Sequence, residues 1–429
     1  MDSNSIINSN RIDVVSLGVG DLATLAVDAR VAISSADVLI GADHHFQEVY
    51  QLASTARCIK YPSPFNKLDE LLKLYAGHKI TVLASGDALF FGVGRSLCNL
   101  IDRSLLRFHA NVSSVQACFH AIGMPWQNAR VVSLHGRSTS SIRRELRPGI
   151  ALAVLTDTIS TPQVVAAELI HADMSESTVW VCESMGSDEQ VVNTYTAREL
   201  VNSNRRFHAL NVCIAQLNSN GQHLPTFPGI ADHLFLTGSR PGFGMISKRE
   251  VRLSILSCMQ PVPGEIAWDI GAGCGSVSVE WSRWNPLGKI YAIESNEERI
   301  SYLNQNREKF GVEDNCMVVH GVAPAVCGGL PKPNCIFIGG SSGALNELLE
   351  LSWSVLEVGG KLVVSAVTTE SQQVIDDWRQ KAQETQVTAE WIELSIRKTI
   401  ASDRSIRELA PVQILSLVKP GNMTTQLVV

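Results

Sequence analysis

The sequence predicts an α/β protein made of two halves, each built on a β-sheet of mostly parallel strands. Short runs rich in β-branched residues alternate with segments of helical periodicity along the 429 residues of the chain, and this alternation is typical of βαβ units. A polar stretch rich in breaker residues, 218–229, interrupts the pattern near the middle. Its composition is that of a domain linker. A chain of this length is also expected to hold more than one domain.

The first half opens with a strand and a helix, predicted at residues 12–17 and 22–34. Further β-branched runs predict strands, and apolar stretches with helical spacing predict helices between them. The strands are expected at residues 38–40, 80–83, 131–134, 150–155, 178–182 and 209–216, and the helices at residues 67–75 and 162–170.

The second half repeats the alternation from a leading helix at residues 248–259. Strands are expected at residues 266–270, 290–294, 317–320, 336–338 and 361–366, helices at residues 277–284, 297–310 and 372–383, and two last strand-like runs at residues 391–396 and 412–418. Such a succession of βα units with a terminal strand pair describes a doubly wound, Rossmann-like sheet with a hairpin at its edge.

Composition argues against several classes of protein. The net charge of −6 disfavours a dedicated nucleic-acid binder, which needs a basic surface to displace counterions from phosphates. The ten cysteines contain no C-x-x-C pair, so neither a disulfide framework nor a zinc ribbon is expected. Residues 1–10 lack the features of a signal peptide, and no apolar run approaches the roughly 20 residues of a membrane span. We therefore expect a cytoplasmic protein that binds no nucleic acid, membrane or metal.

The most specific local pattern is a glycine loop that follows a predicted strand and opens a helix. The loop consists of Gly271, Ala272, Gly273, Cys274 and Gly275, two residues after Asp269. A nicotinamide fingerprint would have its third glycine where Ser276 stands. Glu294 ends the next strand, where a carboxylate can accept hydrogen bonds from ribose hydroxyls. The pattern favours S-adenosylmethionine as ligand, with a βα turn that binds nothing as the alternative.

Three further motifs accompany this loop in the second half, at residues 247–252 (SKREVR), 320–324 (HGVAP) and 336–340 (IFIGG). Together they resemble the family of decarboxylating precorrin methyltransferases of cobalamin synthesis, from about residue 232 to the end of the sequence. Ser247 stands where that family usually has threonine, and Asn334 where it usually has aspartate. The resemblance implies that the cofactor contacts Ser247, Gly271, Ala272, Gly273, Cys274, Gly275, Glu294, Gly321 and Ala323, and that the substrate contacts Gly339 and Gly340.

The first half has loops of small residues after its strands, at residues 18–21 (GVGD), 84–87 (ASGD) and 111–114 (NVSS). Each alone is explained by turn chemistry. As an ordered set they resemble the tetrapyrrole methylase family over about residues 11–216, although Val19 and Ala88 stand where that family often has proline. Residues 133–137 (SLHGR), 156–157 (TD) and 182–186 (CESMG) resemble its precorrin-6 branch. The implied cofactor contacts are Gly86, Asp87, Ser113, Ser114 and Thr156.

The two resemblances imply a fused, decarboxylating precorrin-6Y C-5,C-15-methyltransferase. Residues 11–217 would form a tetrapyrrole methylase domain with two α/β subdomains, residues 218–244 a linker, and residues 245–429 a class I methyltransferase domain. The first domain would methylate C-5, and the second would methylate C-15 and remove the ring C acetate carboxyl, giving a precorrin-8-type product. We expect one S-adenosylmethionine per domain and a homo-oligomer. The order of the methylations, the proton donor and the presence of cobalt in the substrate stay open.

No catalytic residue is identified, because methyl transfer from a sulfonium to an enamine-like carbon depends mainly on holding the reactants together. An anionic tetrapyrrole nevertheless requires local cations in a net acidic protein. The candidates for substrate binding are Lys248, Arg249, Arg252, His135 and Arg137. A basic helix face exposed to solvent explains the first three residues about as well as carboxylate binding does. A capped turn explains His135 and Arg137 nearly as well. We interpret His44 and His45 as part of a surface loop rather than as a metal site.

Three other functions stay open from the sequence. An RNA or protein methyltransferase would share the glycine loop, but the net acidity counts against it. A nicotinamide-dependent oxidoreductase would share the strand–loop–helix pattern, but Ser276 counts against it. A scaffold that binds pathway intermediates is conceivable for the first half only, where Val19 and Ala88 replace the two prolines.

Overall fold

The structure, a computed structural model, describes residues 11–53, 55–219, 224–239, 243–399 and 406–421. The chain divides into two compact units. Unit 1 comprises Met1–Gly136 and Pro148–Gln222, and unit 2 comprises Arg137–Arg147 and His223–Val429. The segment Arg137–Arg147, which the sequence placed in the N-terminal domain, is therefore grouped with the C-terminal one.

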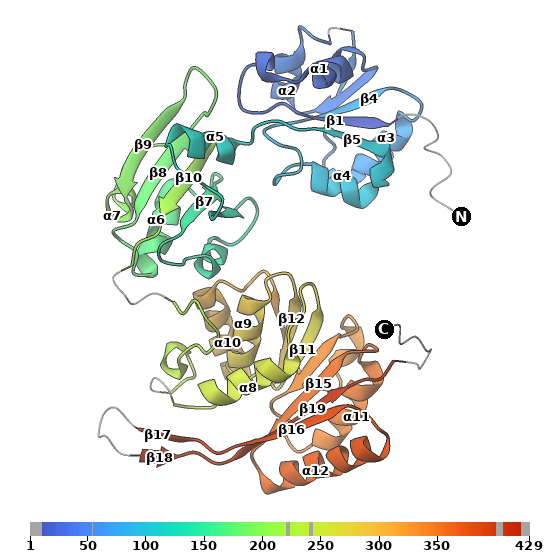
Figure 1. The fold of residues 1–429 in the computed structure, drawn as a ribbon, viewed down its shortest axis with the longest axis vertical. Helices are drawn as coiled ribbons and strands as arrows, with labels where there is room; N and C mark the ends of the chain where they lie inside the picture. Colours follow the sequence, from blue (N-terminus) through green and yellow to red (C-terminus); the bar gives the residue numbers. More distant parts are fainter. Residues whose placement is uncertain (1–10, 54, 220–223, 240–242, 400–405, 422–429) are drawn as a thin grey trace, which may run out of the picture. The chain divides into compact units, whose positions relative to one another are not determined.

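Unit 1 contains a sheet that is parallel throughout, in the order β3-β2-β4-β1-β5. Figure 1 labels its strands β1, β4 and β5. Its strands are β1 (Ile12–Ser16), β2 (Val38–Gly41), β3 (Arg57–Lys60), β4 (Ile80–Ala84) and β5 (Leu106–His109). Its helices are α1 (Val27–Ser34), α2 (Asp43–Val49), α3 (Leu68–Leu74) and α4 (Gly94–Leu100). Alternate residues of β1 pack on opposite faces, because Val14 joins the core under α3 and α4 and Val15 the core under α1 and α2.

The second sheet of unit 1 has the order β6-β7-β10-β8-β9 and is mostly antiparallel. Its strands are β6 (Arg130–Ser133), β7 (Ala151–Leu155), β8 (Thr178–Glu183), β9 (Val191–Thr196) and β10 (Asn211–Gln216), and its helices are α5 (Ser114–Ala121), α6 (Pro162–His171) and α7 (Ala197–Val201). Only β6 and β7 pair in parallel. The expectation of mostly parallel strands is wrong for this sheet, because the connection from β8 to β9 is too short for a parallel crossover.

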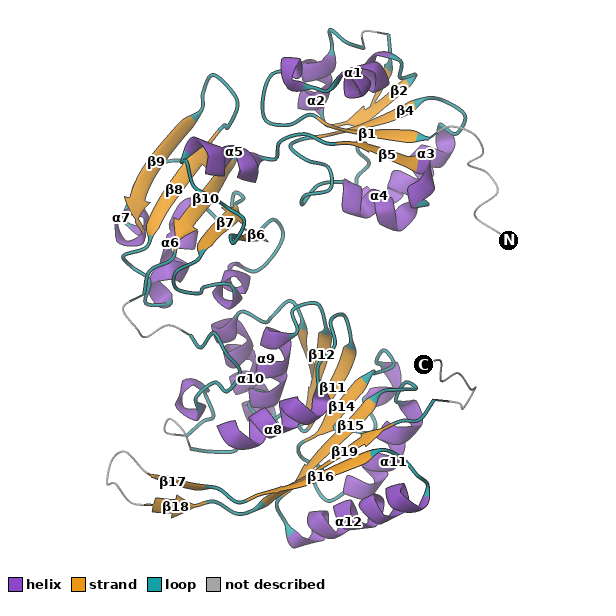
Figure 2. Cartoon of the chain, viewed as in Figure 1, coloured by secondary structure: helices purple, strands orange, loops and turns teal. Residues whose placement is uncertain are grey.

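Unit 2 contains a seven-stranded sheet in the order β13-β12-β11-β14-β15-β19-β16 (Figure 2). Its strands are β11 (Ile266–Ile270), β12 (Lys289–Glu294), β13 (Cys316–His320), β14 (Cys335–Ile338), β15 (Lys361–Ala366), β16 (Ala389–Leu394) and β19 (Val412–Val418). The first five are parallel, and β19 pairs antiparallel with both β15 and β16. The predicted doubly wound sheet with a terminal antiparallel pair is confirmed. A separate pair, β17 (Arg397–Thr399) and β18 (Ile406–Glu408), extends beyond this edge.

Helices cover both faces of the seven-stranded sheet. They are α8 (Arg249–Met259), α9 (Ser276–Trp284), α10 (Glu297–Phe310), α11 (Leu345–Val355) and α12 (Thr369–Glu384). α8, α9 and α10 contribute apolar side chains to the core on one face, and α11 and α12 to the core on the other. This is the doubly wound arrangement, in which ligands bind at the carboxyl ends of the parallel strands.

Most predicted elements are present, with shifted ends. The helix predicted at residues 22–34 begins at Val27, because a 3-10 turn, Leu22–Thr24, precedes it. The other 3-10 turns are Phe65–Lys67, Arg103–Leu105, Thr139–Arg144, Asp232–Leu234 and Cys327–Gly329. The sequence did not predict β3, β5, β9, β17, β18, α2, α4, α5, α7 and α11. Within the described part of the chain, no helix is long and apolar enough to cross a membrane.

The described part of the predicted linker belongs largely to unit 2. Ile230 and Phe235 are fully buried and join α9 and α10 in one apolar cluster. The backbone N–H groups of Gly229 and Ile230 donate to the buried Glu280 carboxylate of α9, at 2.8 and 3.0 Å. The linker residues Gly229, Ile230 and Phe235 therefore pack as part of the C-terminal domain.

A fragment that begins at His223 is expected to be more stable than one that begins at Ala231, by about 3 kcal/mol. The shorter fragment loses the buried Ile230 side chain and both N–H donors to Glu280. Urea unfolding of the two fragments, followed by tryptophan fluorescence, measures the difference. Equal midpoints would show that this segment does not belong to the folded C-terminal domain.

Candidate functional site

The glycine loop of unit 2 connects β11 to α9 at the carboxyl edge of the sheet. Gly271, Gly273 and Gly275 all have positive φ, of 74°, 60° and 81°. A Cβ on Gly271 would lie 2.5 Å from the Gly340 carbonyl oxygen, and one on Gly275 would lie 2.1 Å from Leu303 Cδ1. Among the described residues, a Cβ at Gly273 would meet only the Met245 carbonyl oxygen, at 3.9 Å. Gly271 and Gly275 thus permit close packing, whereas Gly273 borders space that a ligand can enter.

Glu294 ties this loop to the end of β12. Its carboxylate accepts hydrogen bonds from the backbone N–H groups of Gly273, Ser295 and Asn296, at 2.8, 2.9 and 2.9 Å. The side chain is nearly buried. The acid predicted to bind ribose hydroxyls therefore also holds the loop in place.

Asp269, near the end of β11, is a second buried acid beside the loop. The Ser278 hydroxyl donates to its Oδ2, but its Oδ1 has no hydrogen-bond partner in the structure. Burial raises the pKa of Asp269 to about 7, although the hydrogen bonds from Ser278 lower it. A buried carboxylate oxygen without a partner, on the residue two positions before the glycine loop, fits a ligand with a cationic group, such as the sulfonium and ammonium of S-adenosylmethionine.

Loops after β13 and β14 reach the same edge. The Gly321 N–H donates to the Glu294 carbonyl at 3.0 Å, and the Gly339 N–H donates to the Ile270 carbonyl at 2.9 Å. Gly340 lies against Gly271. The structure thus brings the predicted residues Gly321, Gly339 and Gly340 to the glycine loop. Three other predicted residues are packed inside the domain: Ala323 packs on the hydrophobic core, Cys274 is buried, and Ala272 packs beside α10. Ser247 lies two residues after Met245, whose carbonyl oxygen is near Gly273.

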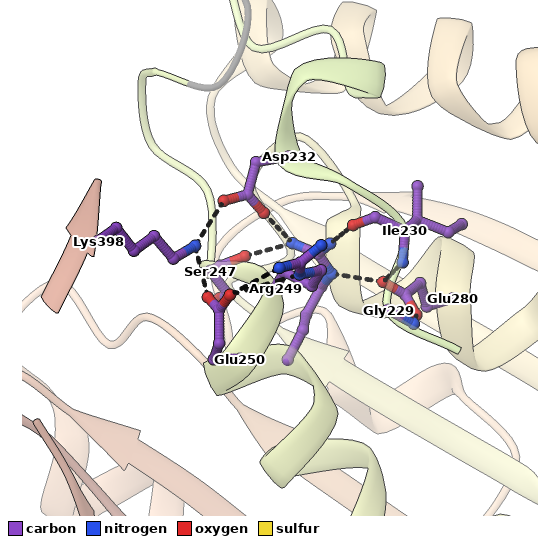
Figure 3. Close-up of polar contacts among 9 residues, drawn as sticks. Gly229, Ile230, Asp232, Ser247, Arg249, Glu250, Glu280 and Lys398 are labelled. Carbon is purple, nitrogen blue, oxygen red and sulfur yellow. Dashed lines mark hydrogen bonds and ion pairs between the residues drawn. The ribbon is translucent and has the colours of Figure 1, made fainter. Parts of the chain in front are cut away.

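Arg252 does not fit the predicted role of substrate ligand, because its guanidinium is completely buried. Figure 3 shows the residues around it, among them Glu280 and Asp232. It forms ion pairs with Glu280 at 2.7 Å and with Asp232 at 3.0 Å. It also donates to the carbonyl oxygens of Ser247 and Ile230. All its contacts are therefore internal, and it joins α8 to α9 and to the segment before α8. From the sequence, the helical spacing of Arg249 and Arg252 had predicted that Arg252 lies on a basic face of the helix.

The two cations before Arg252 remain nearer the surface. Arg249, in the first turn of α8, is exposed and pairs with Glu250 at 3.2 Å. Lys248 caps the helix, and partial burial lowers its pKa. Lys398, on β17, forms ion pairs with Glu250 and Asp232, at 2.5 and 3.8 Å. Lys398 was not among the predicted site residues, because its strand, β17, was not predicted from the sequence.

The N-terminal loops also meet, in unit 1. Gly18 after β1 and Gly86 after β4 exchange two backbone hydrogen bonds of 3.0 Å. A Cβ on Gly86 would lie 3.7 Å from the backbone of Ser113 and Ser114, which begin α5. The Ser113 hydroxyl caps this helix by accepting the Gln116 N–H at 3.2 Å. The three predicted loops therefore meet at the carboxyl edge of the parallel sheet.

Further predicted residues of unit 1 lie at the second sheet. Thr156 is buried and donates to the Asn211 side chain at 2.6 Å, while its carbonyl accepts from His135 Nε2. Asp87, in contrast, follows β4 of the first sheet, and its carboxylate accepts the Leu89 N–H at 2.8 Å. His135 and Thr156 are thus brought together, but Arg137 belongs to unit 2.

His44 and His45 differ from the sequence interpretation, because they form the first turn of α2 instead of a loop and His45 is buried. Both rings contact the hydroxyl of Ser85. Among the described residues no group of three histidines, cysteines or acids could hold a metal ion.

Comparison with known families gives a match in each half. Residues 11–201 match the model of the tetrapyrrole (corrin/porphyrin) methylases, and residues 242–419 match that of the precorrin methyltransferase domain. The chain is 34% identical over 379 residues to the precorrin-6Y C(5,15)-methyltransferase [decarboxylating] of a Sinorhizobium species. These residues make up 88% of this chain and 89% of that relative.

Two shorter matches concern part of the chain. A probable cobalt-precorrin-6B C(15)-methyltransferase (decarboxylating) of Saccharolobus solfataricus is 36% identical over 146 residues, which are 34% of this chain and 72% of that protein. A crystal structure of a precorrin-6Y C5,15-methyltransferase from Geobacter metallireducens is similar with a TM-score of 0.41 and 31% identity, and covers 46% of this chain and 100% of that one.

Proposed function

The chain belongs to the family of decarboxylating precorrin-6Y C(5,15)-methyltransferases, and from this premise we propose how its two domains divide the reaction. The enzyme methylates a precorrin-6-type tetrapyrrole at C-5 and C-15 and decarboxylates it, as the names of its relatives state for them. In our proposal the tetrapyrrole methylase domain methylates C-5. The C-terminal domain methylates C-15 and removes the acetate carboxyl.

The observation that carries this division is the presence of two separate loop sites, one in each unit. Gly18, Gly86 and Ser113 meet at one sheet edge, and Gly271, Gly273 and Glu294 at another. The relative that acts at C(15) alone and is decarboxylating matches only 34% of the chain, which supports the assignment of those two steps to a single domain. We therefore propose one S-adenosylmethionine per domain.

In the C-terminal site, Gly273 would let the cofactor approach the backbone, while Asp269 would neutralise its positive charge and Glu294 would accept its ribose hydroxyls. S-adenosylmethionine supplies an electrophilic methyl group. The chain's contribution is to hold the reactants in contact and to exclude water, which can lower the barrier by several kcal/mol. Lys248 and Arg249 stay candidates for binding the substrate carboxylates. None of the relatives named above supports an RNA or protein methyltransferase, an oxidoreductase or a scaffold.

Calorimetry on the full chain is expected to find two S-adenosylmethionine sites, and replacement of one glycine in each loop should remove one site at a time. Gly273→Val should abolish the C-terminal site and Gly86→Val the N-terminal site, because each branched side chain enters space next to the loop. Cofactor stoichiometry is the first readout, since it does not depend on the order of the methylations. Product masses then show that Gly273→Val loses decarboxylation and Gly86→Val does not.

Matched controls are available at the opposite edge of each sheet. Gly264, before β11, and Gly77, before β4, also have positive φ and open space around the Cβ position. Gly264→Val and Gly77→Val impose similar backbone strain away from the loops and should leave both sites intact. A single site in the unaltered chain, or loss of decarboxylation in Gly86→Val alone, would refute the division of labour.

A further inference from the structure

Two histidines and a serine come together at the carboxyl edge of the parallel sheet of unit 1. β2 and β4 are neighbours, so α2, which follows β2, starts beside the loop that follows β4. His45 Nε2 lies 2.8 Å from Ser85 Oγ, and His44 Nε2 lies 3.2 Å from the same oxygen. One hydroxyl is therefore shared by two imidazoles.

The hydrogen bonds determine which atoms donate. The Ala42 N–H donates to His45 Nδ1 at 3.1 Å, so a neutral His45 carries its proton on Nε2 and donates to Ser85 Oγ. The hydroxyl proton of Ser85 is then available to His44 Nε2. Burial, together with the neighbouring His44, lowers the pKa of His45 to about 4. His45 thus remains a neutral donor at ordinary pH, and His44 is the acceptor of the group.

The surroundings of His44 contain few other charges. Glu48 lies one turn further along α2, and burial raises its pKa although His44 lowers it. Asp43 is paired with Lys60 of β3 at 2.8 Å. Tyr61 packs its ring against His45 and donates its hydroxyl to a backbone carbonyl.

The position of Ser85 connects the group to the proposed cofactor site. Ser85 directly precedes Gly86, whose backbone pairs with Gly18 and approaches Ser113. Ser85 and His44 are both exposed, whereas His45 is buried beneath them. A substrate methylated at this loop can therefore reach the Ser85 hydroxyl.

We propose that Ser85 and His44 form the proton relay of the N-terminal methylation, with His45 as the positioning residue. The inference rests on the proposed C-5 methylation. A neutral enamine carbon that accepts a methyl group becomes part of a cation, and the macrocycle must then lose one proton. The sulfur–methyl bond breaks as the carbon–methyl bond forms, and S-adenosylhomocysteine leaves. The proton passes from the macrocycle to Ser85 Oγ while the Ser85 proton passes to His44 Nε2, and the resulting imidazolium releases it to water.

The test measures C-5 and C-15 methylation of a precorrin-6-type substrate by the full chain. Ser85→Ala and His44→Gln are expected to lower kcat for C-5 methylation on the order of 100-fold, the usual contribution of a general base. The KM for S-adenosylmethionine and the C-15 reaction should stay unchanged. His44→Gln should also lose the acid limb of the C-5 pH profile, and added imidazole should restore part of the activity of His44→Ala. These last two readouts would not respond to a structural role.

The matched control is His78→Gln, since His78 is an exposed histidine before β4, at the opposite edge of the same sheet. It should leave both reactions unchanged. If the unaltered chain methylates C-5 and the Ser85 and His44 variants do so at the same rate and with the same pH profile, the relay is wrong and the division of labour stands. If the unaltered chain never methylates C-5, the proposed function fails and the relay fails with it.

Discussion

Replacing Arg252 by alanine is expected to lower the free energy of unfolding of the C-terminal domain by about 3–5 kcal/mol, the usual cost of removing one partner of a buried ion pair. The guanidinium is completely buried and contacts Glu280, Asp232 and the carbonyl oxygens of Ser247 and Ile230. Without it, the fully buried Glu280 carboxylate keeps two backbone donors but loses its cation.

The matched control is Arg249→Ala, three positions earlier on the same helix. Arg249 is exposed and forms a surface ion pair with its neighbour Glu250, so its loss should change the free energy of unfolding by less than about 1 kcal/mol. Urea unfolding of the full chain, with the transition of the C-terminal domain followed separately, measures both. Equal effects of the two substitutions would contradict the structural role assigned to Arg252.

Replacing Asp269 by asparagine is expected to stabilise the cofactor-free C-terminal domain at pH 8 by up to about 4 kcal/mol and to weaken its binding of S-adenosylmethionine. Burial raises the pKa of this carboxyl from 3.8 to about 7, so the folded domain holds a proton that the unfolded chain has released. The contribution of this carboxyl to stability is therefore greatest below about pH 4, falls as the pH rises to about 7, and is constant above that. Asparagine at this position removes the loss of stability at high pH, because its side chain carries no charge.

The same carboxyl makes cofactor binding depend on pH. A cationic ligand favours the ionised form, so binding below pH 7 should release a proton and affinity should rise with pH up to about 7. Calorimetry in buffers of different ionisation enthalpy counts that proton. Asp269→Asn should abolish the release, whereas Asp377→Asn, on the exposed side of α12, should not alter it. An unchanged proton release in Asp269→Asn would exclude Asp269 as the titrating group.

Much of the fold could be predicted because strands, helices and the loops between them follow from neighbours in the chain. The glycine loop is an example, since Asp269, Gly271, Gly273 and Gly275 lie within seven residues and their strand–loop–helix geometry is local. The antiparallel pairing of the second sheet in unit 1 was missed, because pairing direction depends on how strands distant in sequence are brought together.

The sequence by itself determined the two-domain α/β organisation, the family, and the loop residues around each proposed cofactor site. Only the tertiary structure decided which polar residues are buried and what they contact. Arg252 is an internal ion-pair partner of Glu280, 28 positions away, and His44 and His45 share the hydroxyl of Ser85, about 40 positions away. The physical reason is that helical spacing places a side chain on a face, whereas its burial and its partners depend on elements that the fold packs against that face.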